Sequence, residues 1–120
     1  MRELAGLSPK TSAAAASGLP NSLFGVCVRD GNKLIGMGRV IGDGGLNFDV
    51  VDVAVHPDYQ RQGLGTRIMT ALMEYIDAVA PDSAYVSLLA DDDAPELYKK
   101  FGFKFTAPRT VGMAFKVQKP

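Results

Sequence analysis

The chain has 120 residues, 47% of them hydrophobic, which is enough to bury one core of ordinary size, so we expect a single domain over residues 1–120. Thirteen basic residues balance thirteen acidic ones, which disfavours nucleic acid or an anionic membrane as a partner. No apolar run approaches the roughly eighteen residues that cross a bilayer, and the amino terminus does not resemble a signal peptide. The single cysteine, Cys27, lies in an apolar run where we expect burial, and with no partner for a disulfide it favours a reducing, cytoplasmic setting.

The amino-terminal half carries signals for one short helix and three strands. Ser8-Pro9 is typical of a helix cap followed by a proline in the first turn, and with the alanine-rich stretch that follows it predicts a short helix. Residues 22–30 and 33–41 are rich in β-branched or aromatic side chains, and the Gly31-Asn32 turn between them predicts a hairpin. The valine-rich run 46–55 predicts a third strand at the centre of a sheet.

The carboxy-terminal half begins with the clearest helix of the chain, at residues 64–79, where apolar side chains recur at helical spacing. Residues 83–90 predict a fourth strand, and residues 94–101 predict a short helix with an early proline. Residues 103–105 and 111–117 predict two further strands joined by a turn. This order of elements predicts an α/β fold with a mixed sheet and helices packed on it.

A glycine-bearing loop joins the third predicted strand to the long helix. Gly63 and Gly65 allow backbone amides to face one point, and the helix start adds unpaired N–H groups and the positive end of its dipole. Arg61 or Thr66 adds a side-chain donor, so the loop predicts a diphosphate site. The spacing differs from the phosphate loops of nucleoside triphosphatases and dinucleotide oxidoreductases, which disfavours both classes.

Two segments resemble the signatures of the GCN5-related N-acetyltransferase (GNAT) superfamily. Gln60-Arg61-Gln62-Gly63-Leu64-Gly65, preceded by Val55-His56-Pro57, is similar to the family's acetyl-CoA motif, [QR]-x-x-G-x-[GA]. The segment from Ala94 to Phe103 is similar to a second signature, A-x-x-L-Y-x-K-x-G-F. The resemblance runs from Leu23 to about Val117 and implies a GNAT-like acyl-CoA N-acyltransferase fold with a shortened amino-terminal region.

The resemblance implies acetyl-CoA, or coenzyme A, as the cofactor. In this family the pantetheine arm pairs with main chain between two splayed strands, as an added strand would. An asparagine that often contacts the pantetheine is replaced here by the acidic run 91–93, in which Asp91 or Asp93 is the candidate contact. Helix capping and attraction of a cationic amine are the alternatives. The cofactor-binding residues so implied are Val53, Ala54, Val55, Gln60, Arg61, Gln62, Gly63, Leu64, Gly65, Thr66 and Asp91.

The resemblance also assigns candidate catalytic residues. Tyr98 matches the position whose phenol protonates the leaving thiolate, and its ordinary pKa of about 10 keeps it protonated at neutral pH. Asp52, on the third strand, is the candidate general base; Asp49 and a chain of water molecules are alternatives. His56 is interpreted as a capping or packing residue.

The implied function is transfer of acetyl from acetyl-CoA to a primary amine, with a small molecule as the expected acceptor. Acetylation of a peptide or protein amine is one alternative, and a module that binds acyl-CoA without turnover is another. We expect no metal site, because the acidic run 91–93 lacks calcium-site spacing. The first strand of the family is not evident in the sequence; either the amino-terminal region is shortened, or a neighbouring chain covers that edge in a homodimer.

Overall fold

The structure is a computed structural model that describes residues 10–91 and 94–120. The chain divides into two compact units, one ending at Leu88 and the other running from Leu89 to Pro120, and we describe each by itself. No helix in the described part of the chain is long and apolar enough to cross a membrane.

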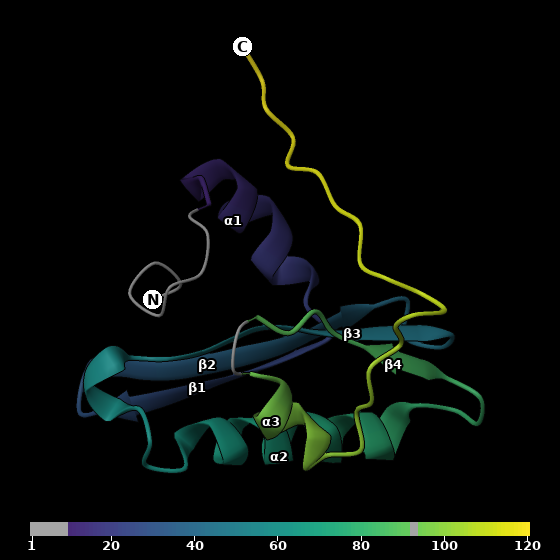
Figure 1. Ribbon diagram of the computed structural model, residues 1–120. Helices are drawn as coiled ribbons and strands as arrows, with labels where there is room; N and C mark the ends of the chain where they lie inside the picture. Colours follow the sequence, from purple (N-terminus) through teal and green to yellow (C-terminus); the bar gives the residue numbers. More distant parts are fainter. Residues whose placement is uncertain (1–9, 92–93) are drawn as a thin grey trace. The chain divides into compact units, whose positions relative to one another are not determined.

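The first unit contains a mixed four-stranded sheet (Figure 1). Its strands lie in chain order: β1 (Phe24–Asp30), β2 (Lys33–Gly42), β3 (Asn47–Val55) and β4 (Tyr85–Ser87). Strand β2 is antiparallel to both β1 and β3, and β4 pairs in parallel with β3. The predicted hairpin, the inner position of the third strand and the α/β mixed-sheet fold class are confirmed.

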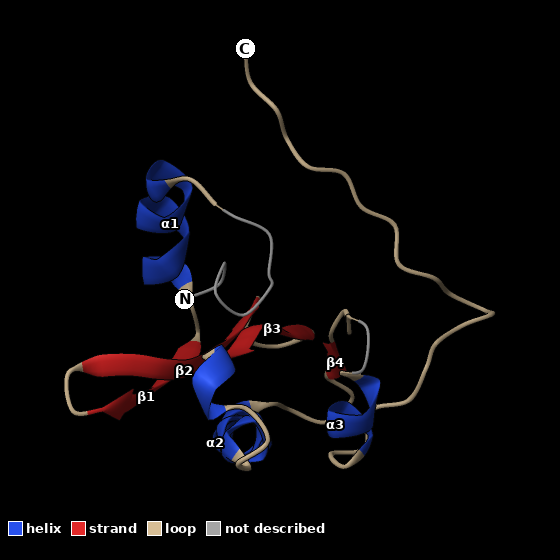
Figure 2. Ribbon diagram, turned by 60° about the vertical axis from the view of Figure 1, so that its left-hand side comes forward, coloured by secondary structure: helices blue, strands red, loops and turns tan. Residues whose placement is uncertain are grey.

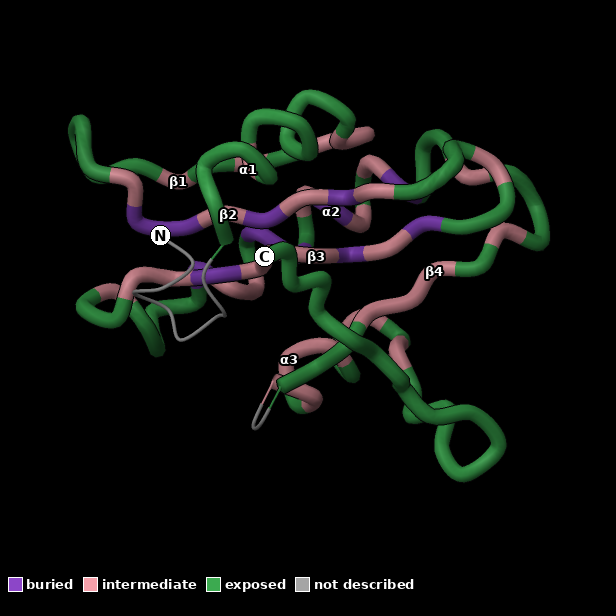
Figure 3. Tube along the Cα trace, turned by 90° about the horizontal axis from the view of Figure 1, so that it is seen from above, coloured by how far each residue is buried: buried purple, intermediate pink, exposed green. Residues whose placement is uncertain are grey.

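The long helix α2 (Leu64–Val79) packs along one face of β1, β2 and β3 (Figures 1 and 2). Its buried side chains are Leu64, Ile68, Met69, Leu72 and Ile76, as its apolar periodicity predicts. The helix packs against β2 and β3, whose buried residues are Ile35, Val40, Phe48, Val50 and Ala54. Figure 3 colours the buried parts of these strands and of α2 purple. Together they form the core of this unit.

Glycines in β2 let the helix approach the sheet closely. A Cβ atom at Gly38 would lie 2.7 Å from Cγ2 of Ile68, and one at Gly36 would lie 3.0 Å from Cδ1 of the same side chain. Both distances are too short for ordinary packing, so no larger residue fits at Gly38 without moving the helix.

The first helix begins later than expected. Helix α1 (Ser12–Gly18) starts after Thr11, whose Oγ1 accepts a hydrogen bond of 3.1 Å from the backbone N–H of Ala14. A short 3₁₀ turn, η1 (Leu19–Asn21), follows it. The expected cap at Ser8-Pro9 lies outside the described residues.

The prediction that Cys27 is buried is wrong. Cys27 is exposed, because β1 is an edge strand and its side chains alternate between the two faces. Its neighbour Val28 points toward Gly36 and α2, which places Cys27 on the opposite face.

Strand predictions in the carboxy-terminal part are largely wrong. The fourth strand spans only Tyr85–Ser87 instead of 83–90, and residues 103–105 and 111–117 form no strand in the described chain. A strand depends on pairing with another strand, and apolar alternation alone does not provide that pairing. The predicted helix is present as α3 (Pro95–Lys99) in the second unit.

The close approach of α2 to β2 leads to a prediction about the free energy of unfolding. We expect Gly38→Ala to lower the free energy of unfolding by about 1–3 kcal/mol, because the new Cβ overlaps Ile68 and crowds Leu72. Gly25→Ala is the matched control, since its Cβ would lie at ordinary contact distance, 3.7 Å, from its nearest neighbours. Urea unfolding of both variants measures the difference, and equal stabilities would contradict the packing argument.

Candidate functional site

The strand that leads into the predicted cofactor loop is interrupted by a β-bulge. Met37 pairs with Ala54, whereas Arg39 pairs with Val51, so β3 holds one more residue than β2 in this interval. Asp52 lies in the bulge with a φ of 56°, in the left-handed region that aspartate tolerates better than most residues. The bulge bends β3 immediately before its last three residues.

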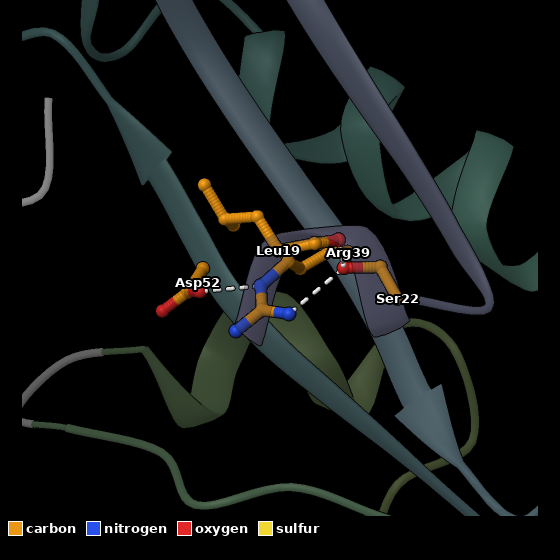
Figure 4. Close-up of polar contacts among 4 residues, drawn as sticks. All are labelled: Leu19, Ser22, Arg39 and Asp52. Atoms are coloured by element: carbon orange, nitrogen blue, oxygen red, sulfur yellow. Dashed lines mark hydrogen bonds and ion pairs between the residues drawn. The ribbon is translucent and has the colours of Figure 1, made fainter. Parts of the chain in front are cut away.

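An ion pair across the two strands holds the bulge (Figure 4). The Nε of Arg39 lies 2.7 Å from Oδ2 of Asp52, and the two side chains are only 20% and 11% exposed. Nη1 of Arg39 donates to Oγ of Ser22 at 2.8 Å, and the Ser22 hydroxyl donates to the carbonyl of Leu19. Sequence reasoning missed Arg39, although a single charged residue within the apolar run 34–41 is a detectable signal.

Beyond the first residues of β3, its outer edge is not covered by β4. The parallel pairing joins Asn47, Phe48 and Asp49 to β4, and the hydroxyl of Ser87 donates to Oδ1 of Asp49 at 2.6 Å. After Asp49 no residue of β3 pairs with β4 in the described sheet. The edge that carries the predicted pantetheine contacts is therefore open.

The end of β3 shows which main-chain groups face this edge. The N–H of His56 donates to the carbonyl of Ile35 in β2, so by alternation Ala54 also faces β2 while Val55 faces away. The carbonyl of Val55 accepts a hydrogen bond of 3.0 Å from Nε2 of Gln60. Gln60 thus ties the cofactor loop to the end of the strand.

A short 3₁₀ turn, η2 (Pro57–Tyr59), connects β3 to the loop and is anchored at both ends. Nδ1 of His56 accepts from the N–H of Asp58 at 3.1 Å, which confirms a capping role for this histidine. The hydroxyl of Tyr59 donates to Oδ2 of Asp30 at 2.6 Å, and this hydrogen bond raises the pKa of the Tyr59 phenol. The hairpin end of β1 and β2 thereby fixes the path of the chain into the loop.

The loop itself has two residues in the left-handed region, Arg61 with a φ of 64° and Gly63 with a φ of 83°. Gly63 is the N-cap of α2 and has no side chain with which to cap the helix. The first intrahelical bond of the turn runs from the N–H of Arg67 to the carbonyl of Gly63, which leaves the N–H groups of Leu64, Gly65 and Thr66 at the open end of the helix.

This donor set fits a diphosphate. Left-handed residues within a loop turn successive N–H groups toward one side, and the helix dipole adds partial positive charge at the same point. The guanidinium of Arg61, an exposed residue, adds a full positive charge within the loop.

The second unit contains the other two predicted site residues. Tyr98 is half-buried on α3, and its ring makes an edge contact with Phe103 at a centroid distance of 6.2 Å. Burial, and then the negative charge of Asp91, raise the pKa of the Tyr98 phenol. The backbone carbonyl of Asp91 accepts from the N–H of Ala94, which caps α3 without a side-chain bond; residues 92 and 93 lie outside the described chain.

The structure therefore groups the predicted site residues by unit. Those on β3, in the loop and in the first turn of α2 lie along one continuous strand–loop–helix path in the first unit. Tyr98 and Asp91 lie near one another in the second unit. Among the described residues, no group of three or more His, Cys, Asp or Glu side chains is arranged to hold a metal ion.

Comparisons with solved structures define the class of fold. A crystal structure of a probable acetyltransferase from methicillin-resistant Staphylococcus aureus aligns with a TM-score of 0.94 at 54% identity, covering 97% of this chain and 87% of that one. A GNAT-family protein from Streptococcus pneumoniae aligns with a TM-score of 0.72 at 27% identity, covering 91% of this chain and 82% of that one. The fold is that of the acyl-CoA N-acyltransferases of the GNAT type.

Sequence comparison gives the family. The model of the acetyltransferase (GNAT) domain matches residues 20–105, a range that crosses both units, and the chain belongs to this family. An uncharacterized N-acetyltransferase of Pyropia yezoensis is 36% identical over 76 residues, which are 62% of this chain and 42% of that protein. A protein of Glycine max named a histone acetyltransferase is 35% identical over 81 residues, 68% of this chain and 34% of that protein. The chain thus spans less than half the length of these curated relatives.

The ion pair at the bulge leads to a prediction about stability. We expect Asp52→Asn and Arg39→Gln each to destabilise the protein, because each leaves a largely buried partner without its counter-charge. In a double-mutant cycle by urea unfolding, the coupling energy between the two positions is expected to be about 1–3 kcal/mol. Additive effects within about 0.5 kcal/mol would show that the pair does not hold the bulge.

Proposed function

We propose that this protein is an acetyl-CoA-dependent N-acetyltransferase that acts on a primary amine of a small molecule. The observation that carries the proposal is the loop 60–66, in which two left-handed residues and an uncapped helix start gather main-chain donors after an open strand edge. Membership of the GNAT family supports acetyl transfer as the reaction.

The first unit would hold the cofactor by main chain. The N–H groups of Leu64, Gly65 and Thr66 would bind the diphosphate together with the side chain of Arg61. The open edge at Val53 and Val55 would pair with the pantetheine amides in the manner of an added strand. Ala54 turns its main chain toward β2, so its contribution is to keep β3 in register.

Three tasks accompany the reaction: the amine must lose a proton, the thioester carbonyl must be stabilised, and the departing sulfur must gain a proton. Bound acetyl-CoA supplies the acetyl group and the thiolate leaving group. As the C–N bond forms and the C–S bond breaks, the phenol of Tyr98 would give its proton to the sulfur. The raised pKa of Tyr98 keeps that proton in place at neutral and mildly alkaline pH.

Asp52 remains the proposed base for the amine. Its carboxylate lies on β3 immediately before the edge assigned to pantetheine, although one oxygen already accepts from Arg39. Asp49, whose carboxylate accepts from Ser87, is the neighbouring alternative, and a water chain would serve the same purpose. The backbone N–H groups of Val53 and Val55, which face away from β2, are the proposed donors to the carbonyl oxygen.

A protein amine is the second candidate acceptor. It is favoured by the printed name of the Glycine max relative, a histone acetyltransferase, which shares 35% identity with 68% of this chain. The balanced charge of this chain, thirteen basic and thirteen acidic residues, favours the small molecule, because the chain has no net charge with which to attract a basic or acidic polypeptide.

Binding of coenzyme A tests the loop. We expect Gly63→Ala to raise the dissociation constant for coenzyme A by about tenfold or more, because alanine resists the left-handed conformation by about 1–2 kcal/mol and turns the N–H groups away. Gly63→Asn should bind nearly as well as the parent, since asparagine tolerates this conformation. Gly44→Ala is the matched control, a left-handed glycine with open space in the β2–β3 turn. Equal affinities of all four proteins in calorimetry would remove the loop from the cofactor site.

Turnover tests Tyr98. We expect Tyr98→Phe to bind coenzyme A as the parent does and to lower kcat by about 10²-fold or more, the usual contribution of a positioned acid. The difference should persist from neutral pH to beyond the ordinary phenol pKa of about 10, because the raised pKa of Tyr98 delays loss of the phenol proton. Thiol release with a panel of amines and peptides measures both. A variant with unchanged kcat at every pH would refute the assigned role.

The same panel separates the alternatives. Release with small amines alone supports the proposal, whereas release with peptides alone favours the protein acceptor. Binding of coenzyme A with no release from any member of the panel favours a module that holds acyl-CoA without turnover.

A further inference from the structure

The turn η2 carries the chain from the end of β3 into the loop 60–66, and His56 holds this turn at its start. The N–H of His56 donates to the carbonyl of Ile35 at 2.7 Å, which fixes the residue to β2. The His56 carbonyl accepts from the N–H of Tyr59 at 2.9 Å, and Nδ1 of its ring accepts from the N–H of Asp58 at 3.1 Å. Because Pro57 has no N–H, both backbone donors of the turn bond to His56.

The conformation of η2 decides where the loop 60–66 begins. The hydroxyl of Tyr59 ties the far end of the turn to Asp30, at the end of the β1–β2 hairpin (Figure 1). Nε2 of Gln60, the first residue of the loop, donates back to the last carbonyl of β3. The side-chain cap at His56 is therefore one of three side-chain bonds that guide the chain into the loop.

The cap at His56 exists only while the imidazole is neutral. A neutral imidazole has one donor nitrogen and one acceptor nitrogen, whereas a protonated imidazole has two donors and no acceptor. Because Nδ1 accepts, the ring proton of the neutral form lies on Nε2. Protonation of Nδ1 would set two N–H groups against one another and break the bond from Asp58. Histidine is the side chain that ordinarily changes its charge between about pH 8 and about pH 5.

The charged and titratable groups around His56 come from η2 and from the β1–β2 hairpin. Oδ2 of Asp58 lies 3.9 Å from Nδ1, and the ring of Tyr59 meets the imidazole edge-on at a centroid distance of 5.8 Å. Asp30 accepts from the Tyr59 hydroxyl, and Nζ of Lys33 lies 5.4 Å from the Tyr59 ring centroid. The hydrogen bond to Asp30 raises the pKa of the Tyr59 phenol, so this group stays protonated throughout the range. Asp58 is exposed, so it attracts a protonated imidazole only weakly.

We propose that neutral His56 positions the cofactor loop, and that protonation of its ring releases the loop and weakens the binding of coenzyme A as the pH falls from about 8 to about 5. This inference rests on the coenzyme A site proposed above. His56 is a positioning residue, because it acts on the cofactor site through η2 and the loop.

Two effects of protonation oppose one another. A positive charge on His56 adds to that of Arg61 in the loop and attracts the diphosphate, whereas loss of the cap turns the loop donors away from it. Salt at about 0.15 M screens the attraction beyond about 8 Å, but it does not restore the cap. The affinity therefore falls with falling pH when the cap dominates, and it rises when charge alone acts.

Calorimetry with dephospho-coenzyme A at about 0.15 M salt tests this sign. The probe keeps the diphosphate and lacks the 3′-phosphate, a monoester that itself gains a proton near pH 6. The dissociation constant of the parent should rise about fivefold from about pH 8 to about pH 5, as expected for the loss of one cap. His56→Leu, which has no acceptor, should bind weakly at both pH values. His56→Asn should restore the affinity and keep it in acid, because its Oδ1 takes the place of Nδ1 and does not titrate.

Asp58→Asn is the matched control, since it removes the nearby carboxylate and keeps the N–H that His56 caps. It should retain the parent's loss of affinity in acid; a pH-independent affinity would assign the effect to the ion pair and refute the cap. A parent affinity that stays constant or rises on acidification would overturn the inference and leave the coenzyme A site in place, as would an equal loss in His56→Asn. A folded parent that binds neither coenzyme A nor the probe at about pH 8 would remove the proposed function, and this inference with it.

Nuclear magnetic resonance tests the cap without any ligand. His56 is the single histidine of the chain, so protein labelled with nitrogen-15 in histidine gives the spectrum of one imidazole. At about pH 8 we expect the tautomer with its proton on Nε2, and the amide shift of Asp58 should follow the titration of the ring. A neutral ring with its proton on Nδ1 has no acceptor for this amide and would disprove the proposed role.

Discussion

Close contact between α2 and the glycines of β2 is the constraint on which the first unit depends. Because Gly36 and Gly38 have no side chains, Ile68 lies almost against the backbone of the sheet. The helix axis is thereby fixed relative to β2, and the first turn of α2 is fixed with it. The N–H donors of the loop 60–66 are therefore positioned both by this packing and by the loop sequence.

The bulge at Asp52 gives the other half of the site its shape. The pairing of β3 with β4 ends at Asp49, and the bulge follows at Asp52, directly before the residues assigned to pantetheine. Asp52 adopts a left-handed conformation that costs free energy, and the contact with Arg39 holds it there. The last residues of β3 thus keep their pairing to β2 beyond the bulge, while their other edge is not paired with β4.

Local signals predicted much of this arrangement. The hairpin at Gly31-Asn32, the long helix and the loop with Gly63 follow from turn chemistry and periodicity, and each is confirmed as structure. The pairing of Arg39 with Asp52 could not be predicted from the sequence, because it depends on which residues of β2 and β3 lie opposite one another across the bulge. The strands expected at 103–105 and 111–117 failed for a related reason: alternation shows that a segment suits a sheet, but not that a neighbour is present.

The hydrogen bond between Arg39 and Ser22 has a consequence for how the chain opens. Helix α1 has no buried residue, and the polar link at Ser22 is the described side-chain bond that joins the turn after it to the sheet. Amide protons of α1 should therefore exchange with solvent through fraying that leaves the core intact, whereas those of Ile68 and Leu72 need cooperative unfolding of the whole unit. The free energy needed to open the amino-terminal helix α1 is thus lower than the free energy needed to open α2.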